Sequence, residues 1–419
     1  MTDNSPPTPS GPTERLASLD VLRGATILVM IFVNDLAGVR GAPAWMKHFH
    51  PSDGDGMTFV DVVFPAFLFI VGMSIPFAIG RRLDRGDSPW KVWRHILTRA
   101  LGLLAIGVFM VNAENMPDQG LLPAPLWALL MYVGVFMVWS APPRASGRPP
   151  QRSIVLRGAG IVLLLLLAIL YRGKGEPAFI ELRPQWWGIL GLIGWAYLVT
   201  CTVYLLARKN LPAVIGTIPL LYCIFIAHAA GAFAGWTWLT DWILIGSMLG
   251  SHAGITVSGL ALGIVLAPGS PFQAHRDRLR WGLVYGLALA AAAHLLHAAH
   301  GVHHMFIFNK NMATPPWCLL SSAITIGVWI LLYWSIEVQK RGRWARLLEP
   351  AGQNPLTAYL LAPVLYCLFE LLSLATGLPY VYATLGATFA VGFWRAVLMA
   401  VLVAWLAGRL RRLGVQLAL

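Results

Sequence analysis

Residues 19–35, LDVLRGATILVMIFVND, and residues 56–76, GMTFVDVVFPAFLFIVGMSIP, decide the fold class of this chain. Each belongs to an apolar segment long enough to cross a bilayer, which takes about 17–25 residues of helix. The loop between them carries polar and aromatic side chains, namely Trp45, Lys47, His48, His50, Asp53 and Asp55. Because polar groups held at a membrane are costly unless they serve a function, this hairpin is the first candidate for a functional site.

The composition indicates a membrane protein. Of the 419 residues, 57% are hydrophobic and only 12% are charged, whereas soluble domains carry about a quarter charged residues; the mean hydropathy is +0.66. Apolar segments of spanning length lie at residues 16–39, 58–80, 91–111, 122–141, 153–171, 187–206, 212–232, 252–267, 280–300, 316–337, 354–375 and 390–410. We therefore expect an all-α polytopic membrane protein with about twelve transmembrane helices. Residues 1–15 are expected to form a disordered cytoplasmic tail, and residues 16–419 a single bundle.

The basic residues predict the orientation of the bundle. With the N-terminus in the cytoplasm, 24 of the 31 Lys and Arg residues fall on the inner side and seven on the outer side. Cytoplasmic loops are enriched in Lys and Arg, so both termini are expected there, and the net charge of +13 needs no nucleic-acid partner. Most of the histidines, among them His48 and His50, fall on the outer side. This favours a binding or catalytic site that faces the periplasm or a lumen.

The hairpin contains candidate catalytic residues. Thr58 and Asp61 have the spacing of a capping box. Alternatively, the Asp61 carboxylate orients a histidine such as His48 and stabilises its charged form. The sequence leaves both roles open. Asn34 and Asp35, at the outer end of the first segment, are expected to be uncompensated polar groups facing the same loop.

Candidate binding residues follow further along the chain. In FNKNMATPPW, residues 308–317, Lys310 and Asn311 lie on the outer side just before the tenth segment. Lys310 either meets an anionic group or is solvated. Asn354, at the start of the eleventh segment, either caps that helix or lines a cavity.

A group of histidines stands near the outer end of the ninth segment. His294, His297 and His300 follow three-residue steps, which bring side chains together on a helix. A zinc site is one interpretation. Since no Cys, Asp or Glu accompanies them and such steps drift around the helix, we expect polar lining of a cavity and no bound metal.

Several blocks of this sequence resemble one known family. LDVLRGATILVMIFVN, then KH, then GMTFVDVVFPAFLFIVGMSI resembles the start of the membrane domain of heparan-α-glucosaminide N-acetyltransferase and its bacterial relatives. The likeness recurs at RPQWWGILGLIGW, at residues 246–263, at FNKNMATPPW and at PAGQNPLTAY, in the same order. The first block is the most specific.

The resemblance implies an acyltransferase of the bacterial inner membrane. Acetyl-CoA would supply the acetyl group from the cytoplasm, and a sugar or glycan amine or hydroxyl would receive it on the outer face. By position the Lys-His pair selects His48, while the loop HFHPSDGDG departs from the family spacing and leaves His50 as an alternative base. Asn34, Asp61, Lys310 and Asn311 fall on family-like positions.

The same resemblance leaves several points open. Departures at LLMYVG and LLAP leave the acceptor open. The histidine is expected to act either as a general base or as a nucleophile that carries the acetyl group. Membrane lipid is an expected partner, and a homodimer is one candidate assembly. The alternative function is a secondary transporter of a small polar or anionic solute.

Overall fold

The computed structural model describes residues 16–117, 121–140, 151–173 and 179–417. The tail expected at residues 1–15 lies outside this range. Within it, eleven helices are long and apolar enough to cross a membrane. A further apolar helix, Ala124–Trp139, has 16 residues and corresponds to the predicted segment 122–141. The prediction of an all-α, multi-pass integral membrane protein is confirmed.

The long helices are α1 (Ala17–Leu36), α2 (Val60–Ile75), α4 (Pro89–Glu114), α5 (Ala124–Trp139), α6 (Gln151–Leu170), α7 (Gly188–Ala207), α8 (Leu211–Ala229), α10 (His252–Leu266), α11 (His275–His297), α12 (Pro315–Tyr333), α14 (Pro355–Thr376) and α16 (Phe389–Arg412). The short ones are α3 (Arg81–Asp84), α9 (Thr237–Thr240), α13 (Glu349–Gln353) and α15 (Val381–Thr384). Turns of 3-10 helix lie at Ala44–Met46, His304–Phe306 and Arg343–Leu347, and π-helical stretches at Pro76–Gly80, Ile245–Ser251 and Trp334–Val338.

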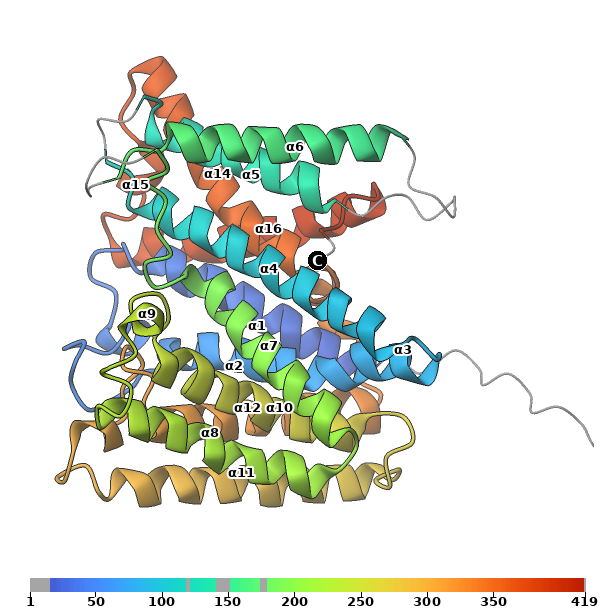
Figure 1. Cartoon of the computed structure of the whole chain (residues 1–419). Coiled ribbons are helices and arrows are strands. Elements are labelled where there is room, and N and C mark those ends of the chain that lie inside the picture. The colour runs from blue at the N-terminus through green and yellow to red at the C-terminus, as the bar shows by residue number, and fades with distance from the viewer. Residues whose placement is uncertain (1–15, 118–120, 141–150, 174–178, 418–419) are drawn as a thin grey trace, which may run out of the picture.

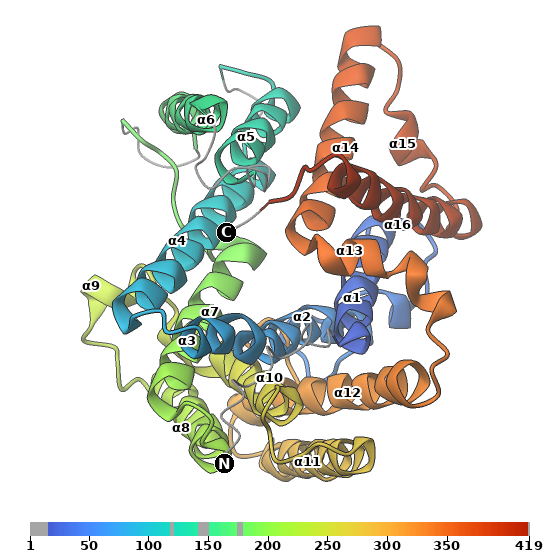
Figure 2. The same ribbon diagram turned by 90° about the vertical axis from the view of Figure 1, so that its right-hand side faces the viewer.

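The long helices run side by side and cross the bundle in alternating directions (Figure 1). We call the end with the α1–α2 loop, residues 37–59, the His48 end. The opposite end, which carries α3, is the Arg81 end. Seen along the helices, α2 and α10 lie inside a surround that includes α1, α7, α8 and α12 (Figure 2).

The contact between α2 and α10 is the centre of the bundle, and glycines make it possible. A Cβ atom at Gly72 of α2 would lie 1.8 Å from the carbonyl oxygen of Thr256, and one at Gly259 of α10 would lie 1.9 Å from that of Phe69. Small residues let the two backbones touch, which is how helices associate where lipid gives no hydrophobic driving force. This contact fixes α2, whose start carries part of the candidate site, against α10.

The span that ends in α10 is longer than predicted. The sequence predicted a short segment at 252–267, whereas the structure begins the span at Ile245 with the π-helical stretch Ile245–Ser251. Its glycines and serines lower the local hydropathy, so the hydropathy pattern did not extend the predicted segment over these seven residues. The apolar window of Ile245–Leu266 is 94% buried inside the protein. Such π-helical stretches are frequent at functional sites.

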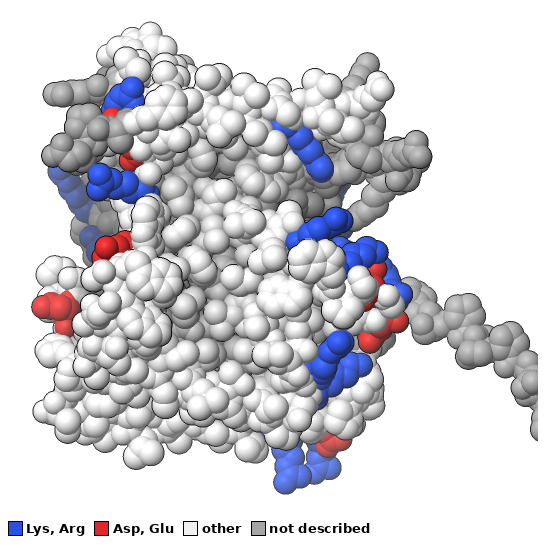
Figure 3. All heavy atoms as spheres, in the orientation of Figure 1, with Lys and Arg blue, Asp and Glu red and all other residues white. Residues whose placement is uncertain are grey.

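Charged side chains are absent from most of the face shown in Figure 3. Lys and Arg gather along its edges, among them the edge that carries α3 and the start of α4 (Figures 1 and 3). The wide uncharged band between the edges is what a bilayer requires of the surface it covers.

Candidate active site

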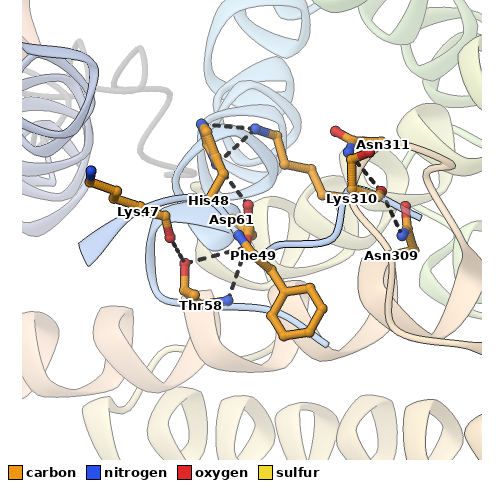
Figure 4. A network of polar contacts seen from close by, with 9 residues as sticks. Lys47, His48, Phe49, Thr58, Asp61, Asn309, Lys310 and Asn311 are labelled. Carbon is orange, nitrogen blue, oxygen red and sulfur yellow. Dashed lines mark hydrogen bonds and ion pairs between the residues drawn. The ribbon is translucent and has the colours of Figure 1, made fainter. Parts of the chain in front are cut away.

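His48 is held by a buried carboxylate. It lies in the α1–α2 loop just after the turn Ala44–Met46, and its Nδ1 is 2.7 Å from Oδ1 of Asp61 (Figure 4). The Asp61 side chain is 2% exposed and that of His48 is 48% exposed. An ionised carboxylate only accepts hydrogen bonds, so Nδ1 carries a hydrogen, and in the neutral form of the imidazole Nε2 then has the lone pair.

The second carboxylate oxygen of Asp61 fastens the loop to the start of α2. Oδ2 accepts hydrogen bonds from the backbone amides of Phe49, at 3.0 Å, and Thr58, at 2.9 Å, and from the Thr58 hydroxyl at 3.3 Å. The sequence left open whether Asp61 stabilises the helix start or orients a histidine. In the structure one oxygen contacts each, so both interactions are present.

Lys310 reaches the same imidazole from a distant part of the chain. Its Nζ lies 3.0 Å from Nδ1 and 3.1 Å from Nε2 of His48. Because Nζ is nearly equidistant from the two ring nitrogens, it lies over the imidazole and not along the lone pair of either nitrogen. Burial lowers the pKa of Lys310 below its usual value, although the Asp61 carboxylate opposes this shift. The neighbouring Lys47 points away from the imidazole (Figure 4).

Asn309 is the residue that ties the two loops together. Its Nδ2 donates to the carbonyl oxygens of Ser52, at 3.0 Å, and Gly54, at 2.9 Å, and its Oδ1 accepts from the Met312 amide at 2.9 Å. Its side chain is buried. Asn311 is exposed and adds one bond to Ser52. Asn311 was among the residues predicted from the sequence, whereas Asn309 was not; the only sequence signal for Asn309 is its place beside Lys310.

His297, the last residue of α11, contacts the α1–α2 loop. His297 Nε2 lies 2.7 Å from Oδ2 of Asp55, whose other oxygen accepts from the Phe308 amide at 2.8 Å. The rings of His297 and Phe308 stack with centroids 4.3 Å apart. Burial raises the pKa of Asp55, but the hydrogen bonds from His297 and Phe308 outweigh it and hold the pKa below its usual value. Over the described residues no cluster of three or more His, Cys, Asp or Glu side chains has a metal-binding arrangement.

Of the two candidate histidines, the structure brings His48 into the network. Asp61 and Lys310 contact His48, and His48 also lines a cavity. His50 is exposed two residues further along the loop. The catalytic role of His48 remains a prediction, while its position between an acidic and a basic side chain is a structural finding.

Two cavities lie within the bundle. The His48 cavity, of about 370 Å³, is lined by His48, Asn34, Lys310, Asn311 and His252 together with apolar side chains. The Arg23 cavity, of about 350 Å³, is lined by Arg23, Ser74, Arg99 and Tyr197 with apolar side chains of α2, α7 and α14. Met30 and Ile189 line both. The two cavities are therefore adjacent, with these side chains between them, inside the membrane-spanning part.

The expectation for Asp35 is wrong. Asp35 was expected to be uncompensated and to face the hairpin loop. Instead its Oδ2 accepts from Arg395 at 3.1 Å and its Oδ1 accepts from the hydroxyls of Tyr382 and Tyr366. This carboxylate is satisfied by α14, α15 and α16, and only Asn34 lines the His48 cavity.

Asn354 lies far from His48, at the opposite end of the bundle. It directly precedes α14, and the neighbouring Gly352 packs against the backbone of Asp20 in the first turn of α1. Its carbonyl oxygen accepts from the Ala358 amide, as expected of a helix start. Its side chain makes no capping bond and donates to the Val415 carbonyl at 3.3 Å. Neither cavity is lined by it.

A family profile described as "Domain of unknown function (DUF5009)" matches residues 15–242, more than half of the chain. This protein belongs to that family. It is also similar to the curated heparan-alpha-glucosaminide N-acetyltransferases of Mus musculus, 37% identical over 110 residues, and Homo sapiens, 37% identical over 98 residues. These matches cover 26% and 23% of this chain, and 16% and 14% of the relatives. The resemblance seen in the sequence is confirmed.

The DUF5009 segment holds only part of the site. Asn34, His48 and Asp61 lie within residues 15–242, whereas Lys310 and Asn311 lie beyond it. Asn309 bonds the α11–α12 loop to the α1–α2 loop, which belongs to the family segment. The candidate site of this DUF5009 chain therefore combines residues from inside and from outside residues 15–242.

Proposed function

We propose that this protein is a membrane-embedded acetyltransferase. It moves an acetyl group from cytoplasmic acetyl-CoA to an amine or hydroxyl of a sugar or glycan at the outer, His48 end. The observation that carries this proposal is the His48 imidazole between Asp61 and Lys310 at a cavity in the bundle. The names of the similar N-acetyltransferases support the reaction class.

The geometry of His48 suits acyl transfer. Asp61 fixes the hydrogen on Nδ1, which leaves the Nε2 lone pair to take a proton from the acceptor or to attack the thioester itself. The Lys310 ammonium, 3.1 Å from Nε2, lies within reach of a carbonyl oxygen bound there. A positive group at that point stabilises the negative charge that develops on the oxygen during transfer. Asn34 and Asn311 line the same cavity and offer further polar contacts.

The two cavities support delivery of the donor from the opposite end. The Arg23 cavity contains two guanidinium groups within otherwise largely apolar walls, namely Arg23, which is paired with Asp20, and Arg99, which lies over the Tyr197 ring. CoA combines anionic phosphates with a long, weakly polar arm that ends in the thioester. Cationic groups at one end, apolar walls between and His48 at the other end fit that chemistry. The predicted orientation, with the basic loops inside, places the Arg81 end in the cytoplasm.

Purified full-length protein with labelled acetyl-CoA and a panel of amino-sugar acceptors tests the proposal. We expect His48→Ala to reduce transfer by at least about a hundredfold, the usual share of a general base. His50→Ala, the matched control two residues away, should retain most activity. Equal activity of His48→Ala and wild type would refute the site. A wild type that neither binds acetyl-CoA nor releases CoA would refute the reaction and favour the transporter.

A further inference from the structure

His252 is a second histidine at the His48 cavity, and the described structure gives one of its ring nitrogens no partner. It begins α10 directly after the π-helical stretch Ile245–Ser251. The residue is 6% exposed and lines the cavity, and its ring lies edge to face against Phe64 with centroids 5.5 Å apart. Its Nδ1 is buried without a hydrogen-bond partner among the described residues.

An unpaired nitrogen at this place points to a ligand. Buried side-chain polar atoms are nearly always hydrogen-bonded, and an exception calls for an explanation. The nearby walls of the cavity include the apolar side chains of Phe64, Leu244 and Met248. Nδ1 is shielded from solvent, so a polar group of a bound molecule would pair with the other ring nitrogen, Nε2, which has no hydrogen bond among the described residues.

The cavity that His252 lines indicates which chemical group of a substrate it would bind. Phe64, which its ring contacts, follows Asp61 by three residues in α2, so it lies about 4.5 Å deeper along the helix axis. His252 thus contacts α2 about one turn beyond Asp61, and it lines the His48 cavity together with Met30 and Ile189, the side chains shared with the Arg23 cavity. A thioester that arrives through the Arg23 cavity therefore enters a space lined by both His252 and His48.

We propose that His252 binds the carbonyl oxygen of the acyl thioester. This inference rests on the proposed acetyltransferase function and adds a substrate contact from α10. As the acceptor nitrogen or oxygen bonds to the acetyl carbon, the carbonyl electron pair moves onto its oxygen. It returns when the C–S bond breaks, sulfur leaves with the bonding pair, and the acceptor's proton passes through His48 to the thiolate. The imidazole N–H of His252 donates to the oxygen throughout and stabilises its charge.

The test compares two unreactive CoA derivatives that differ in one oxygen. Acetonyl-CoA keeps a ketone carbonyl near the position of the thioester carbonyl, and S-propyl-CoA has a methylene in its place. Binding of both to full-length protein is measured by calorimetry. We expect His252→Phe, which keeps a ring and loses the N–H, to reduce the preference for acetonyl-CoA about fivefold, as loss of one neutral hydrogen bond does. His252→Gln should keep part of that preference.

Ser258→Ala, a buried α10 variant outside the cavity lining, serves as the control and should keep the wild-type preference. If His252→Phe weakens both derivatives equally, His252 only packs the cavity and the inference is overturned. If His252→Phe does not fold, the preference of His252→Leu decides in the same way. A wild type that binds neither derivative refutes the proposed function itself, whereas binding with an unaltered preference in the variants refutes only the role of His252.

Discussion

The ammonium of Lys310 lies 3.0 Å and 3.1 Å from the two ring nitrogens of His48, although 262 residues separate them in the chain. On the other side of the same ring system, Asp61 accepts the Nδ1 hydrogen. The imidazole is thus placed between a carboxylate that accepts its hydrogen and an ammonium group. This arrangement gives the two nitrogens of His48 different tasks.

Asp61→Asn should abolish most acetyl transfer while leaving the donor bound. The amide cannot stabilise the imidazole charge that forms during proton transfer, so we expect kcat to fall at least about a hundredfold. The affinity for acetyl-CoA, measured by calorimetry, should change little. A parallel loss of both quantities would show that Asp61 only maintains the loop.

Lys310→Met should lower kcat and also remove the alkaline limit of activity. Burial lowers the pKa of Lys310, so it loses its proton at a lower pH than a free lysine does. Activity that needs the ammonium is therefore full below this lowered pKa and falls as pH rises through it. A pH–rate profile of wild type, with Lys310→Arg as the control that keeps the charge, measures this. A similar alkaline limb in Lys310→Met would contradict the assignment.

Asn309→Ala should disconnect the loop of Lys310 from the loop of His48. It removes two buried hydrogen bonds to the Ser52 and Gly54 carbonyls, and unpaired buried groups cost about 1–3 kcal/mol. We expect a lower unfolding temperature together with reduced transfer. Asn311→Ala, which removes one bond at an exposed position, is the control for stability and should unfold near the wild-type temperature.

Asp55→Asn should remove one source of acid sensitivity. The pKa of Asp55 is held below its usual 3.8 in the folded protein, so the unfolded chain binds its proton first as pH falls. The contribution of Asp55 is thus fully present above about pH 4 and is lost as pH falls through the lowered folded value. Thermal unfolding of wild type and variant across this range should show the two curves converging at low pH. Parallel curves would exclude this role.

Gly72→Ala should loosen the α2–α10 contact. The added Cβ would lie 1.8 Å from the Thr256 carbonyl oxygen, so the helices must separate, at a cost of about 1–3 kcal/mol or more. Gly327→Ala, in α12 with no atom within 4 Å of its Cβ, is the matched control. Fluorescence-detected thermal unfolding in detergent should separate the two. Equal stability would mean that α2 and α10 adapt without loss.

The membrane fold is visible in the sequence because its signal is local. Each apolar run of spanning length, such as residues 16–39 or 58–80, must become a helix to satisfy its backbone in lipid. The sequence therefore predicted the all-α fold and the positions of most spans, with about twelve helices expected and eleven of spanning length and apolarity among the described residues. The same logic failed at Ile245–Ser251, where small and polar residues form a spanning stretch only because the surrounding helices bury it.

Part of the candidate site could be predicted from the sequence, and part of it depends on the tertiary structure. The sequence singled out His48, Asp61, Lys310 and Asn311 one by one, from residue type and resemblance. It gave no account of Asn309 and placed Asp35 wrongly, because both depend on partners hundreds of residues away.

Only the tertiary structure decided that Asp61 and Lys310 meet on His48 rather than His50, and that His252 lines the same cavity. The physical reason is that a hydrophobic pattern fixes where a helix forms, whereas hydrogen bonds and charges act across a few ångströms. Helix packing, such as the glycine contact of α2 with α10, determines which side chains come within that distance.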